Sequence, residues 1–434
     1  MTVVIVGAGA AGLVAAAFAA AGGAEVTLIE RTADGGRKIL ISGGGRCNVL
    51  PSVLAPERFV TDAPAHLMRN MLRAWPLREQ RNFFERDLGI ALALEQQSGK
   101  LFPQSNRAKD IRDGLVAHAR ERGVRLQFGT TVTGIQPGQR SGGGDPSWSA
   151  GAPGAKGEGL PAGFTVQTSA GDIHASRVVL ATGGMSVPLT GSDGTGLRIA
   201  GGLGHRMIDT YPALTPLLSS APGHAALSGV SLDVRLRGKS GKKSIETSGG
   251  FLFTHRGYSG PSVLDISHLV TRLAHRSLGE GGTIRAQWCP LDAAAWEKEF
   301  DAPSALVFSL VSRHVAARLA ERLMTEAGVP ADRRTSALKR TERLALIDRL
   351  TAYELPISGD EGYKKAEVTG GGVALDEVAP RTLESRRCPG LYFCGEMLDA
   401  FGPIGGHNFA WAWATGRAAG LAAGSKGSKV KSEK

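Results

Sequence analysis

The stretch "TVVIVGAGAAGL", residues 2–13, decides the fold of this 434-residue chain. Its first five residues are an unbroken apolar and β-branched run, which predicts a buried strand. Three glycines at the spacing Gly-x-Gly-x-x-Gly follow and open an Ala-rich segment that predicts a helix to about Gly22. The next run, residues 24–30, predicts a second strand that ends at Glu30. Together these features form a dinucleotide-binding βαβ fingerprint.

Each part of the fingerprint has an expected role. Glycine lets the backbone approach a pyrophosphate, which lies over the helix N-terminus where unpaired N–H groups point outward. Glu30 is expected to accept hydrogen bonds from the adenosine ribose hydroxyls, which disfavours a 2′-phosphate there. The fingerprint by itself does not distinguish FAD from NAD.

Two later stretches favour FAD. Residues 177–184, "RVVLATGG", predict a strand that ends in Thr-Gly-Gly close to the dinucleotide. Residues 391–396, "LYFCGE", predict another strand, and "GPIGGHN" at residues 402–408 then starts a helix. The N-terminus of that helix carries about half a positive charge. Aimed at the N1–C2=O edge of a flavin, it would stabilise the negative charge that collects there on reduction.

A second glycine-rich run, "GRKILISGGGRCN" at residues 36–48, stands shortly after the fingerprint. Each ordered glycine costs about 0.5–1 kcal/mol relative to alanine. We therefore interpret the run as backbone that lies against the rest of the same FAD, whose contacts offset this cost. The run is expected to be loosely ordered in the apoprotein.

Composition describes an ordinary globular protein, with 42% hydrophobic and 21% charged residues, and the length allows two or three domains. No apolar stretch reaches the roughly 18 residues of a membrane span, and no signal peptide is expected. The four cysteines show no metal-type spacing, so no metal site is predicted. Scattered thiols of this kind are typical of a cytoplasmic protein.

The formal charge of +11 invites a nucleic-acid interpretation. The tail "GSKGSKVKSEK", residues 424–434, holds four of the lysines and one glutamate, and most other basic residues lie in mixed-sign segments such as 313–349. Solvated surface charge is therefore favoured over a nucleic-acid partner. The sequence does not indicate an oligomeric state.

The pattern of apolar residues predicts a discontinuous α/β protein. Residues 1–198 and 364–424 are expected to form a Rossmann-like FAD-binding domain, interrupted by an inserted domain at 199–363. The insert has a β part at about 205–292 and a helical part at about 293–355, where one apolar stripe, residues 307–323, predicts a continuous helix. Residues 137–163 are expected to be an extended flexible loop, and residues 425–434 a disordered basic tail.

The chain resembles the bacterial YhiN/BaiN-like flavoproteins, a family of NAD(P)/FAD-dependent oxidoreductases that includes aminoacetone-oxidase-type FAD-binding enzymes. The motifs that carry the resemblance span nearly the whole chain: "GAGAAGL", "GRKILISGGGRCN", "ATGG", "GSDGTGLRIAGGLGH", "PALTPL", "LFTHRGYSGPSVL", "TGGGV" and "GLYFCGEMLDAFGPIGGHN". The resemblance implies a fold of the glutathione-reductase/fumarate-reductase type, with a β-barrel-like insertion and a helical subdomain. Because the chain has one dinucleotide fingerprint, an NAD(P)H donor would visit the flavin face transiently.

The resemblance also implies which residues bind the cofactor. The pyrophosphate and ribose would be held by Gly7, Ala8, Gly9, Ala10, Ala11, Gly12, Leu13, Glu30 and Arg31, and the adenine by the backbone of Val132. The ribityl chain and flavin would be held by Arg37, Lys38, Ser42, Gly43, Gly44, Gly45, Arg46, Cys47, Asn48, Ala181, Thr182, Gly183, Gly184, Gly395, Glu396, Gly405, Gly406, His407 and Asn408. Val49-Leu50 replace a common Thr-Asn pair and His407 replaces a common Tyr, which leaves the polarity on the substrate side open.

Three residues are candidate catalytic groups. Arg46 offers a fixed cation near the flavin or a substrate anion, or else a structural ion pair. His255 and Tyr258 are candidate proton donors, with a turn-stabilising role as the alternative. Cys47 is expected to be an inert packed thiol rather than an activated one, and His407 either touches the flavin edge or caps a helix.

The first function predicted is an FAD-dependent oxidoreductase that transfers hydride between a small-molecule substrate and NAD(P)H or oxygen. The first alternative is a flavin-dependent RNA-modifying enzyme, which the basic tail and Arg-rich helices motivate. The second is a non-catalytic, flavin-loaded redox or interaction protein.

Overall fold

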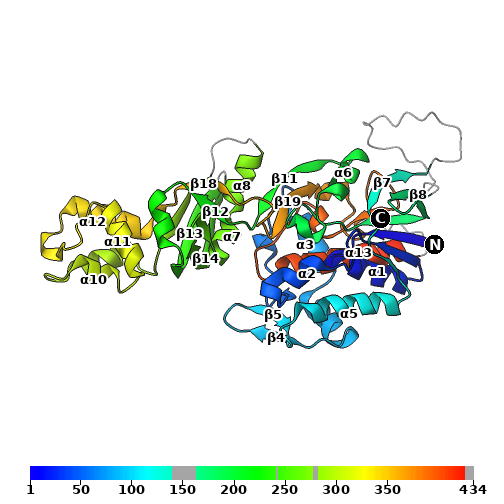
Figure 1. Ribbon diagram of the computed structural model, residues 1–434, viewed down its shortest axis with the longest axis horizontal. Helices are drawn as coiled ribbons and strands as arrows, with labels where there is room; N and C mark the ends of the chain where they lie inside the picture. Colours follow the sequence, from blue (N-terminus) through cyan, green and yellow to red (C-terminus); the bar gives the residue numbers. More distant parts are fainter. Residues whose placement is uncertain (139–162, 241–242, 277–281, 426–434) are drawn as a thin grey trace, which may run out of the picture. The chain divides into compact units, whose positions relative to one another are not determined.

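The computed structural model describes residues 1–138, 163–240, 243–276 and 282–425 (Figure 1). The predicted loop at residues 137–163 and the basic tail therefore lie almost wholly outside the described residues. The chain divides into two compact units, one formed by Met1–Thr210 with Val368–Lys434 and the other by Tyr211–Glu367. No helix within the described residues is long and apolar enough to cross a membrane.

A five-stranded parallel sheet forms the centre of the first unit, in the order β20-β10-β1-β2-β6. Its strands are β1 (Thr2–Val6), β2 (Glu25–Ile29), β6 (Arg125–Gln127), β10 (Arg177–Leu180) and β20 (Leu391–Phe393). The strand ends of β1, β10 and β20 therefore lie next to one another, although β20 is far away in sequence. This arrangement confirms the predicted Rossmann-like fold.

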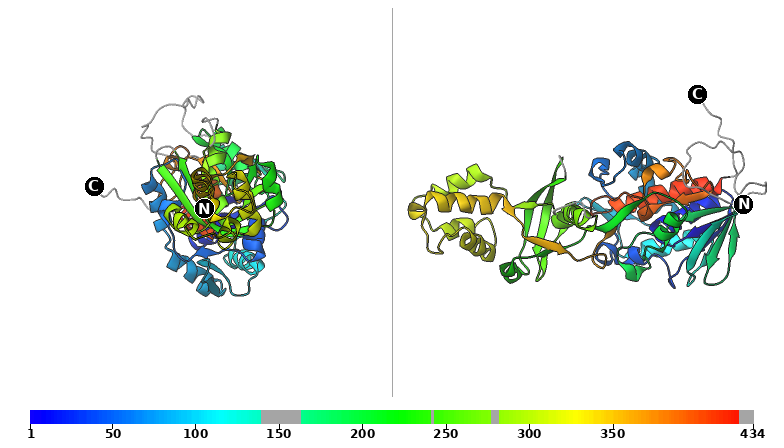
Figure 2. Two further views of the ribbon diagram at one scale, coloured as in Figure 1. Left: turned by 90° about the vertical axis from the view of Figure 1, so that its left-hand side faces the viewer. Right: turned by 90° about the horizontal axis from the view of Figure 1, so that it is seen from above.

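Helix α13 (His407–Gly424) packs along α1 (Ala10–Ala21) and closes the unit (Figures 1 and 2). Gly416, Gly420 and Gly424 recur at i, i+4 and i+8 and face Ala11, Ala15 and Ala19 of α1. A Cβ on each glycine would lie only 2.3–2.4 Å from a backbone oxygen of the facing alanine. The two helices thus approach so closely that only hydrogen fits between them.

We expect Gly420→Ala to destabilise the protein. The helix propensity of alanine favours the substitution by about 1 kcal/mol. The new methyl group, however, would stand 2.3 Å from the Ala15 oxygen, and overpacking of this kind costs about 1–3 kcal/mol. The measurement is the free energy of unfolding in urea.

Gly202→Ala is the matched control, because Gly202 is also helical and a Cβ there would meet nothing within 4 Å. We expect this variant to be as stable as the parent or slightly more stable. Equal stability changes in the two variants would contradict the close packing of α1 and α13.

The remaining elements of the first unit surround the parallel sheet. The helices are α2 (Arg37–Ile41), η1 (Ser42–Gly45), η2 (Pro56–Arg58), α3 (Ala65–Arg73), α4 (Leu77–Asn82), the π-helical turn η3 (Phe83–Asp87), α5 (Ala108–Glu121), η4 (Pro188–Thr190), α6 (Thr195–Gly202), η7 (Leu375–Glu377) and η8 (Gly395–Met397). The strands are β3 (Leu50–Pro51), β4 (Leu92–Glu95) and β5 (Lys100–Pro103) in one antiparallel sheet, β7 (Val132–Pro137), β8 (Phe164–Thr168) and β9 (Ile173–Ala175) in another, and β11 (Met207–Ala213) paired with β19 (Val368–Val373).

The second unit begins later than the predicted residue 199. Helix α6 contacts β7 and β19 and so belongs to the first unit, and the boundary falls inside β11, between Thr210 and Tyr211. The physical reason is that α6 and the start of β11 have their packing partners in the FAD-binding part of the chain.

The second unit contains a seven-stranded antiparallel sheet in the order β17-β16-β13-β14-β15-β12-β18. Its strands are β12 (Leu217–Ser219), β13 (Ser231–Ser240), β14 (Lys243–Phe253), β15 (Gly257–Ser259), β16 (Ile284–Gln287), β17 (Tyr353–Glu354) and β18 (Ile357–Asp360). Only Leu355-Pro356 separates the two edge strands β17 and β18, so the sheet must curl until its edges meet. No ladder joins these two strands among the described residues, which makes the insertion an open barrel.

Helices fill the rest of the second unit. They are η5 (Pro222–Leu227), α7 (Pro261–Ile266), α8 (His268–His275), α9 (Ala293–Phe300), α10 (Val307–Val311), α11 (Ala317–Glu326), η6 (Thr335–Ala337) and α12 (Arg340–Thr351). The continuous helix predicted from the stripe 307–323 is wrong: it is two helices, α10 and α11, with a break at residues 312–316. All six stripe residues are nevertheless buried, because both helices face the same core.

Candidate cofactor site

The glycines of the fingerprint differ in what requires them. Gly7 has φ +103°, and a Cβ there would lie 2.6 Å from the Ala181 oxygen; a Cβ on Gly12 would lie 1.8 Å from the Gly7 oxygen. Internal packing thus requires glycine at both positions. Gly9 has an ordinary φ of −78°, and a Cβ there would meet no described atom within 4 Å. The open space at Gly9 lies directly in front of the N-terminus of α1, where a pyrophosphate fits.

Glu30 follows β2 and turns its buried carboxylate towards the glycine turn. Its Oε2 accepts a hydrogen bond from the Ala8 N–H at 2.8 Å, and its Oε1 accepts two from Thr32, from N–H and Oγ1, both at 2.8 Å. The carboxylate therefore joins the turn after β1 to the turn after β2. Each oxygen can accept further bonds, as ribose hydroxyls would require.

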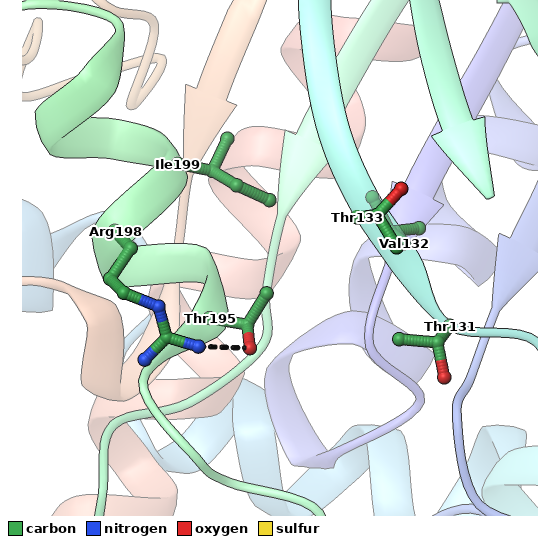
Figure 3. A pocket seen from close by; sticks show the side chains of 6 residues that line it. All are labelled: Thr131, Val132, Thr133, Thr195, Arg198 and Ile199. Carbon is green, nitrogen blue, oxygen red and sulfur yellow. Dashed lines mark hydrogen bonds between the residues drawn. The ribbon is translucent and has the colours of Figure 1, made fainter. Parts of the chain in front are cut away.

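A cavity of about 440 Å³ adjoins this end of the site (Figure 3). Its lining comes from the start of β7 on one side, with Thr131, Val132 and Thr133, and from α6 on the other, with Thr195, Arg198 and Ile199. Val132 and Ile199 offer apolar faces, which suits a flat base such as adenine. The sequence indicated only Val132; the role of α6 was missed, although the Gly-x-Gly pair before it in "GSDGTGLRIAG" is a signal.

Arg31 is fixed beside this end by an ion pair with Asp193, in the loop before α6. Burial raises the pKa of Asp193, but the hydrogen bonds from Arg31 and Thr195 outweigh it and lower the pKa to about 2. Asp193 also accepts from the Thr195 N–H at 3.0 Å and thereby orients the first turn of α6. Arg198 in turn donates to Thr195 Oγ1 at 2.7 Å (Figure 3).

The second glycine run forms α2 and then the tight turn η1. Gly43, Gly44 and Gly45 all have positive φ, at +56°, +67° and +84°, and a Cβ on Gly44 would meet no described atom within 4 Å. The Asn48 Oδ1 is buried against Gly43 and has no hydrogen-bond partner among the described residues. A buried acceptor without a donor costs about 1–3 kcal/mol, so a ligand hydroxyl or N–H fits here. The turn is completed by Ser42, whose Oγ donates to the Ile39 oxygen at 2.8 Å.

A half-buried ion pair joins α2 to the end of β20. Lys38 Nζ donates to Glu396 Oε2 at 2.8 Å and to Ser186 Oγ at 2.5 Å. Glu396 Oε1 accepts from Ser186 Oγ at 2.7 Å and from the Thr369 N–H at 2.9 Å. Gly184 sits inside this cluster, where a Cβ would lie 2.3 Å from Thr369 Oγ1. Four separate chain segments are thereby held together at the carboxyl ends of β10 and β20.

Two glycines with φ +97° precede α13. A Cβ on Gly406 would lie 2.5 Å from the Leu50 carbonyl carbon, so the turn presses against β3, and Gly405 lies beside the Lys100 stem. Asn408 fixes the loop by accepting from the Gly402 N–H and donating to the Gly402 oxygen, both at 2.9 Å. Burial lowers the pKa of His407 to about 4, so its ring is neutral at pH 7.

The other predicted cofactor residues lie on the same elements. Ala10, Ala11 and Leu13 belong to the first turns of α1; Thr182 Oγ1 donates to Met397 Sδ at 3.3 Å; Gly183 has φ +74°; the Gly395 N–H donates to Thr415 Oγ1 at 2.9 Å; and Arg37 pairs with Asp34 at 2.8 Å on the exposed side of α2. Apart from Arg46 and Arg37, whose side chains have protein partners, the predicted residues line one continuous set of loops.

Arg46 is held by the β4–β5 hairpin. Its guanidinium pairs with Glu95 at 3.0 Å and lies 3.9 Å from the centre of the Phe102 ring. Of the two roles that the sequence left open, the structural ion pair is the one for which the structure supplies partners.

The cysteine thiols are buried and protonated. Burial raises the pKa of Cys47 to about 12 and that of Cys388 to about 11, and it also raises the pKa of Cys289 and Cys394. Cys47, whose φ is +64°, is a packed thiol as expected. Within the part of the chain that the structure describes, no cluster of three or more His, Cys, Asp or Glu side chains is suited to a metal ion.

The two candidate proton donors have different environments. His255 is exposed in the turn between β14 and β15. Tyr258 is fully buried in the second unit, where its hydroxyl contacts Ser219 Oγ at 2.9 Å and His224 Nδ1 at 2.6 Å. Burial raises the pKa of Tyr258 well above its usual range. These contacts describe a structural hydroxyl in the core of the second unit.

His224 connects Tyr258 to the helical part of the second unit. Its Nε2 lies 3.0 Å from the Tyr353 hydroxyl and 3.6 Å from Glu326 Oε1, and Arg322 donates to the same oxygen at 2.5 Å. Burial raises the pKa of Glu326, but hydrogen bonds from His224, Tyr353 and Arg322 outweigh it and lower the pKa to about 2. The network ties α11 to the open barrel.

We expect stability to fall in acid through Glu326. Its pKa is about 2 when folded, against 4.5 for the free side chain. A group with a depressed pKa contributes stability above pH 4.5, and this contribution is lost as the pH falls from 4.5 towards 2. The free energy of unfolding of Glu326→Gln should lie below that of the parent at pH 7 and approach it at pH 3. Glu321→Gln, an exposed change on the same helix, should track the parent at both pH values; a Glu326→Gln deficit independent of pH would contradict the prediction.

Together, the parallel sheet, the fingerprint with its open glycine, Glu30 and the second glycine turn define a flavoprotein of the Rossmann type. The chain belongs to the HI0933-like protein Rossmann domain family, whose sequence profile matches residues 1–422. It is thus an FAD-dependent oxidoreductase.

Two relatives cover almost the whole chain. A ribosomal RNA dihydrouridine synthase from Escherichia coli (strain K12) is 33% identical over 95% of each chain. A 3-dehydro-bile acid delta(4,6)-reductase from Clostridium scindens is 30% identical over 96% of this chain and 98% of the relative.

Among solved structures, the 3-ketosteroid delta1-dehydrogenase from Sterolibacterium denitrificans has a TM-score of 0.50 and 13% identity, over 96% of this chain and 98% of that one. This likeness concerns the fold alone.

Proposed function

We propose that the protein holds FAD along the two glycine turns and transfers hydride between a small-molecule substrate and NAD(P)H or oxygen. The observation that carries the proposal is the open space at Gly9, in front of α1 and within the reach of Glu30. Neither the backbone conformation nor the packing of the protein requires glycine there, whereas a pyrophosphate does.

The residues of this chain would bind and orient the cofactor. The N–H groups at the start of α1 would hold the pyrophosphate, Glu30 would orient the ribose, and Val132 would contact the adenine. Asn48 Oδ1, which is buried and unpartnered, would accept from the flavin end. The N-terminus of α13 would stabilise negative charge beside it. Bound FAD supplies the ability to accept and donate a hydride.

The small-molecule assignment is supported by the bile acid reductase relative. We propose that the substrate carries a carbon–carbon double bond, because a dihydrouridine synthase and a delta(4,6)-reductase each reduce one. With a single dinucleotide fingerprint, a nicotinamide donor and the substrate would use the flavin face in turn. We also propose a reducing, cytoplasmic location, in which the four free thiols are stable.

Anaerobic reduction tests this function. The protein with its bound FAD is mixed with NADH or NADPH, and a conjugated steroid ketone is then added while flavin absorbance is followed. We expect at least one nicotinamide to reduce the flavin and the ketone to reoxidise it. Failure of a wide panel of unsaturated small molecules to reoxidise reduced flavin would overturn the small-molecule assignment. Steady turnover would exclude a purely non-catalytic role.

RNA modification is the second candidate function. It is favoured by the relative with 33% identity over 95% of both chains, whose name specifies ribosomal RNA, and by the formal charge of +11. The test is reoxidation of the reduced flavin by unmodified ribosomal RNA, with dihydrouridine measured by mass spectrometry. Reoxidation by RNA but not by small molecules would select this candidate, and the reverse result would reject it.

A further inference from the structure

The exposed face of α3 carries positive charge without acidic neighbours on the same helix. His66, Arg69 and Arg73 lie on this face, which we name the α3 basic face; Met68, Met71 and Leu72 are buried on the other side. From residue 63 to residue 78 the chain has no Asp or Glu. None of the three side chains forms an ion pair with another described residue, whereas most arginines in the helical part of the second unit do.

Acidic groups on the elements packed against α3 are already engaged. Helix α3 contacts η7, where Asp376 pairs with Arg206 and Glu377 pairs with Arg387. It also contacts η2, which holds an exposed Glu57 beside Arg58. The basic face therefore keeps most of its charge for a partner outside the protein.

The α3 basic face is continuous with the flavin end of the candidate site. Just before α3, Val60 exchanges backbone hydrogen bonds with Phe401, at 2.8 and 3.1 Å, and the Asp62 N–H donates to Asp399 Oδ2 at 2.8 Å. Phe59 packs edge-on against His407, with ring centres 6.2 Å apart. Both contacts place the start of α3 beside the loop that leads into α13.

We propose that the α3 basic face binds the phosphate backbone of a single-stranded RNA segment and so delivers a neighbouring nucleotide to the flavin end. The proposal rests on the second candidate function. Arg69 and Arg73 are one helical turn apart, so their side chains can contact neighbouring phosphates. The nine residues of α3 span about 13 Å, the length of roughly four stacked nucleotides.

The experiment measures the affinity of the full-length protein, with FAD bound, for a uridine-rich single-stranded RNA at several salt concentrations. The variant is Arg69→Glu/Arg73→Glu, and Arg69→Gln/Arg73→Gln replaces it if the double charge reversal lowers FAD content or thermal stability. The matched control is Lys109→Glu/Arg120→Glu, which makes the same charge change at two exposed positions of α5 in the same unit.

We expect the α3 variant to bind RNA at least tenfold more weakly and the control to bind as the parent does. Removal of two phosphate contacts should also reduce the slope of log affinity against log salt by about 1.4, at about 0.7 for each contact. Equal losses in variant and control, or no loss in the variant, would overturn the α3 assignment but leave RNA modification standing. Absence of salt-dependent RNA binding by the parent would overturn both, whereas reduction of the flavin by NAD(P)H would be unaffected.

Discussion

Replacement of Gly9 by valine should yield a protein that folds and does not retain FAD. A side chain at Gly9 meets no described atom within 4 Å, and its φ of −78° is ordinary for any residue. The protein itself loses only N-cap preference, about 1 kcal/mol or less. A pyrophosphate over α1 would collide with the new side chain. We expect FAD affinity to fall by at least about a hundredfold, equivalent to about 2.8 kcal/mol.

The measurements are FAD content after purification and FAD affinity of the apoprotein, with circular dichroism to monitor folding. Gly202→Val is the matched control, since Gly202 also faces open space but lies at the end of α6, away from the fingerprint. It should bind FAD as the parent does. Normal FAD content in Gly9→Val would contradict the assignment of this turn to the pyrophosphate.

Replacement of Glu30 by alanine should lower both FAD affinity and stability. The carboxylate accepts the N–H groups of Ala8 and Thr32, each at 2.8 Å, and the substitution leaves both donors unpaired. An unpaired buried N–H costs about 1–3 kcal/mol. Loss of a hydrogen bond between the charged carboxylate and the ribose costs a further 1.5–3 kcal/mol or about 10- to 100-fold in FAD affinity.

Glu30→Gln separates the two effects. A glutamine can accept through one oxygen only, so it keeps one of the two backbone contacts and loses the negative charge. We expect apoprotein stability between those of the parent and Glu30→Ala, together with weakened FAD binding. FAD affinity equal to that of the parent in both variants would show that Glu30 braces the two turns without contacting ribose.

Sequence alone predicted those parts of the site in which chemistry and fold share one short segment. The strand, glycine turn and helix at residues 2–21 are local, and the spacing fixes where backbone N–H groups point. Glu30 could be found because a parallel neighbour of β1 must end at the same sheet edge. For the same reason Gly183 and Gly395, which follow β10 and β20, could be assigned to that edge.

Contacts between distant segments could not be predicted in this way. The partners of Arg46, Glu95 and Phe102, lie on a hairpin whose position depends on tertiary packing. Likewise, the pair between Lys38 and Glu396 joins positions 358 residues apart. The apolar stripe at residues 307–323 kept its period across a turn, so periodicity could not reveal that two helices share one core.

The substrate is the part of the function that the fold does not specify, because one flavoprotein scaffold serves many reactions. Two relatives of similar identity act on different substrates by name, one on ribosomal RNA and one on a bile acid. The difference must therefore lie in side chains around the flavin end and in surfaces next to it, such as the α3 basic face.

Anaerobic addition of NADH and NADPH to the purified, full-length protein is the most direct test of the central claim, which is that this chain is a nicotinamide-reducible FAD enzyme. Visible flavin absorbance is recorded before and after each addition. We predict about one FAD per chain and complete loss of the absorbance with at least one of the two donors. A colourless protein that takes up no FAD from solution would contradict the claim, as would bound FAD that neither donor reduces.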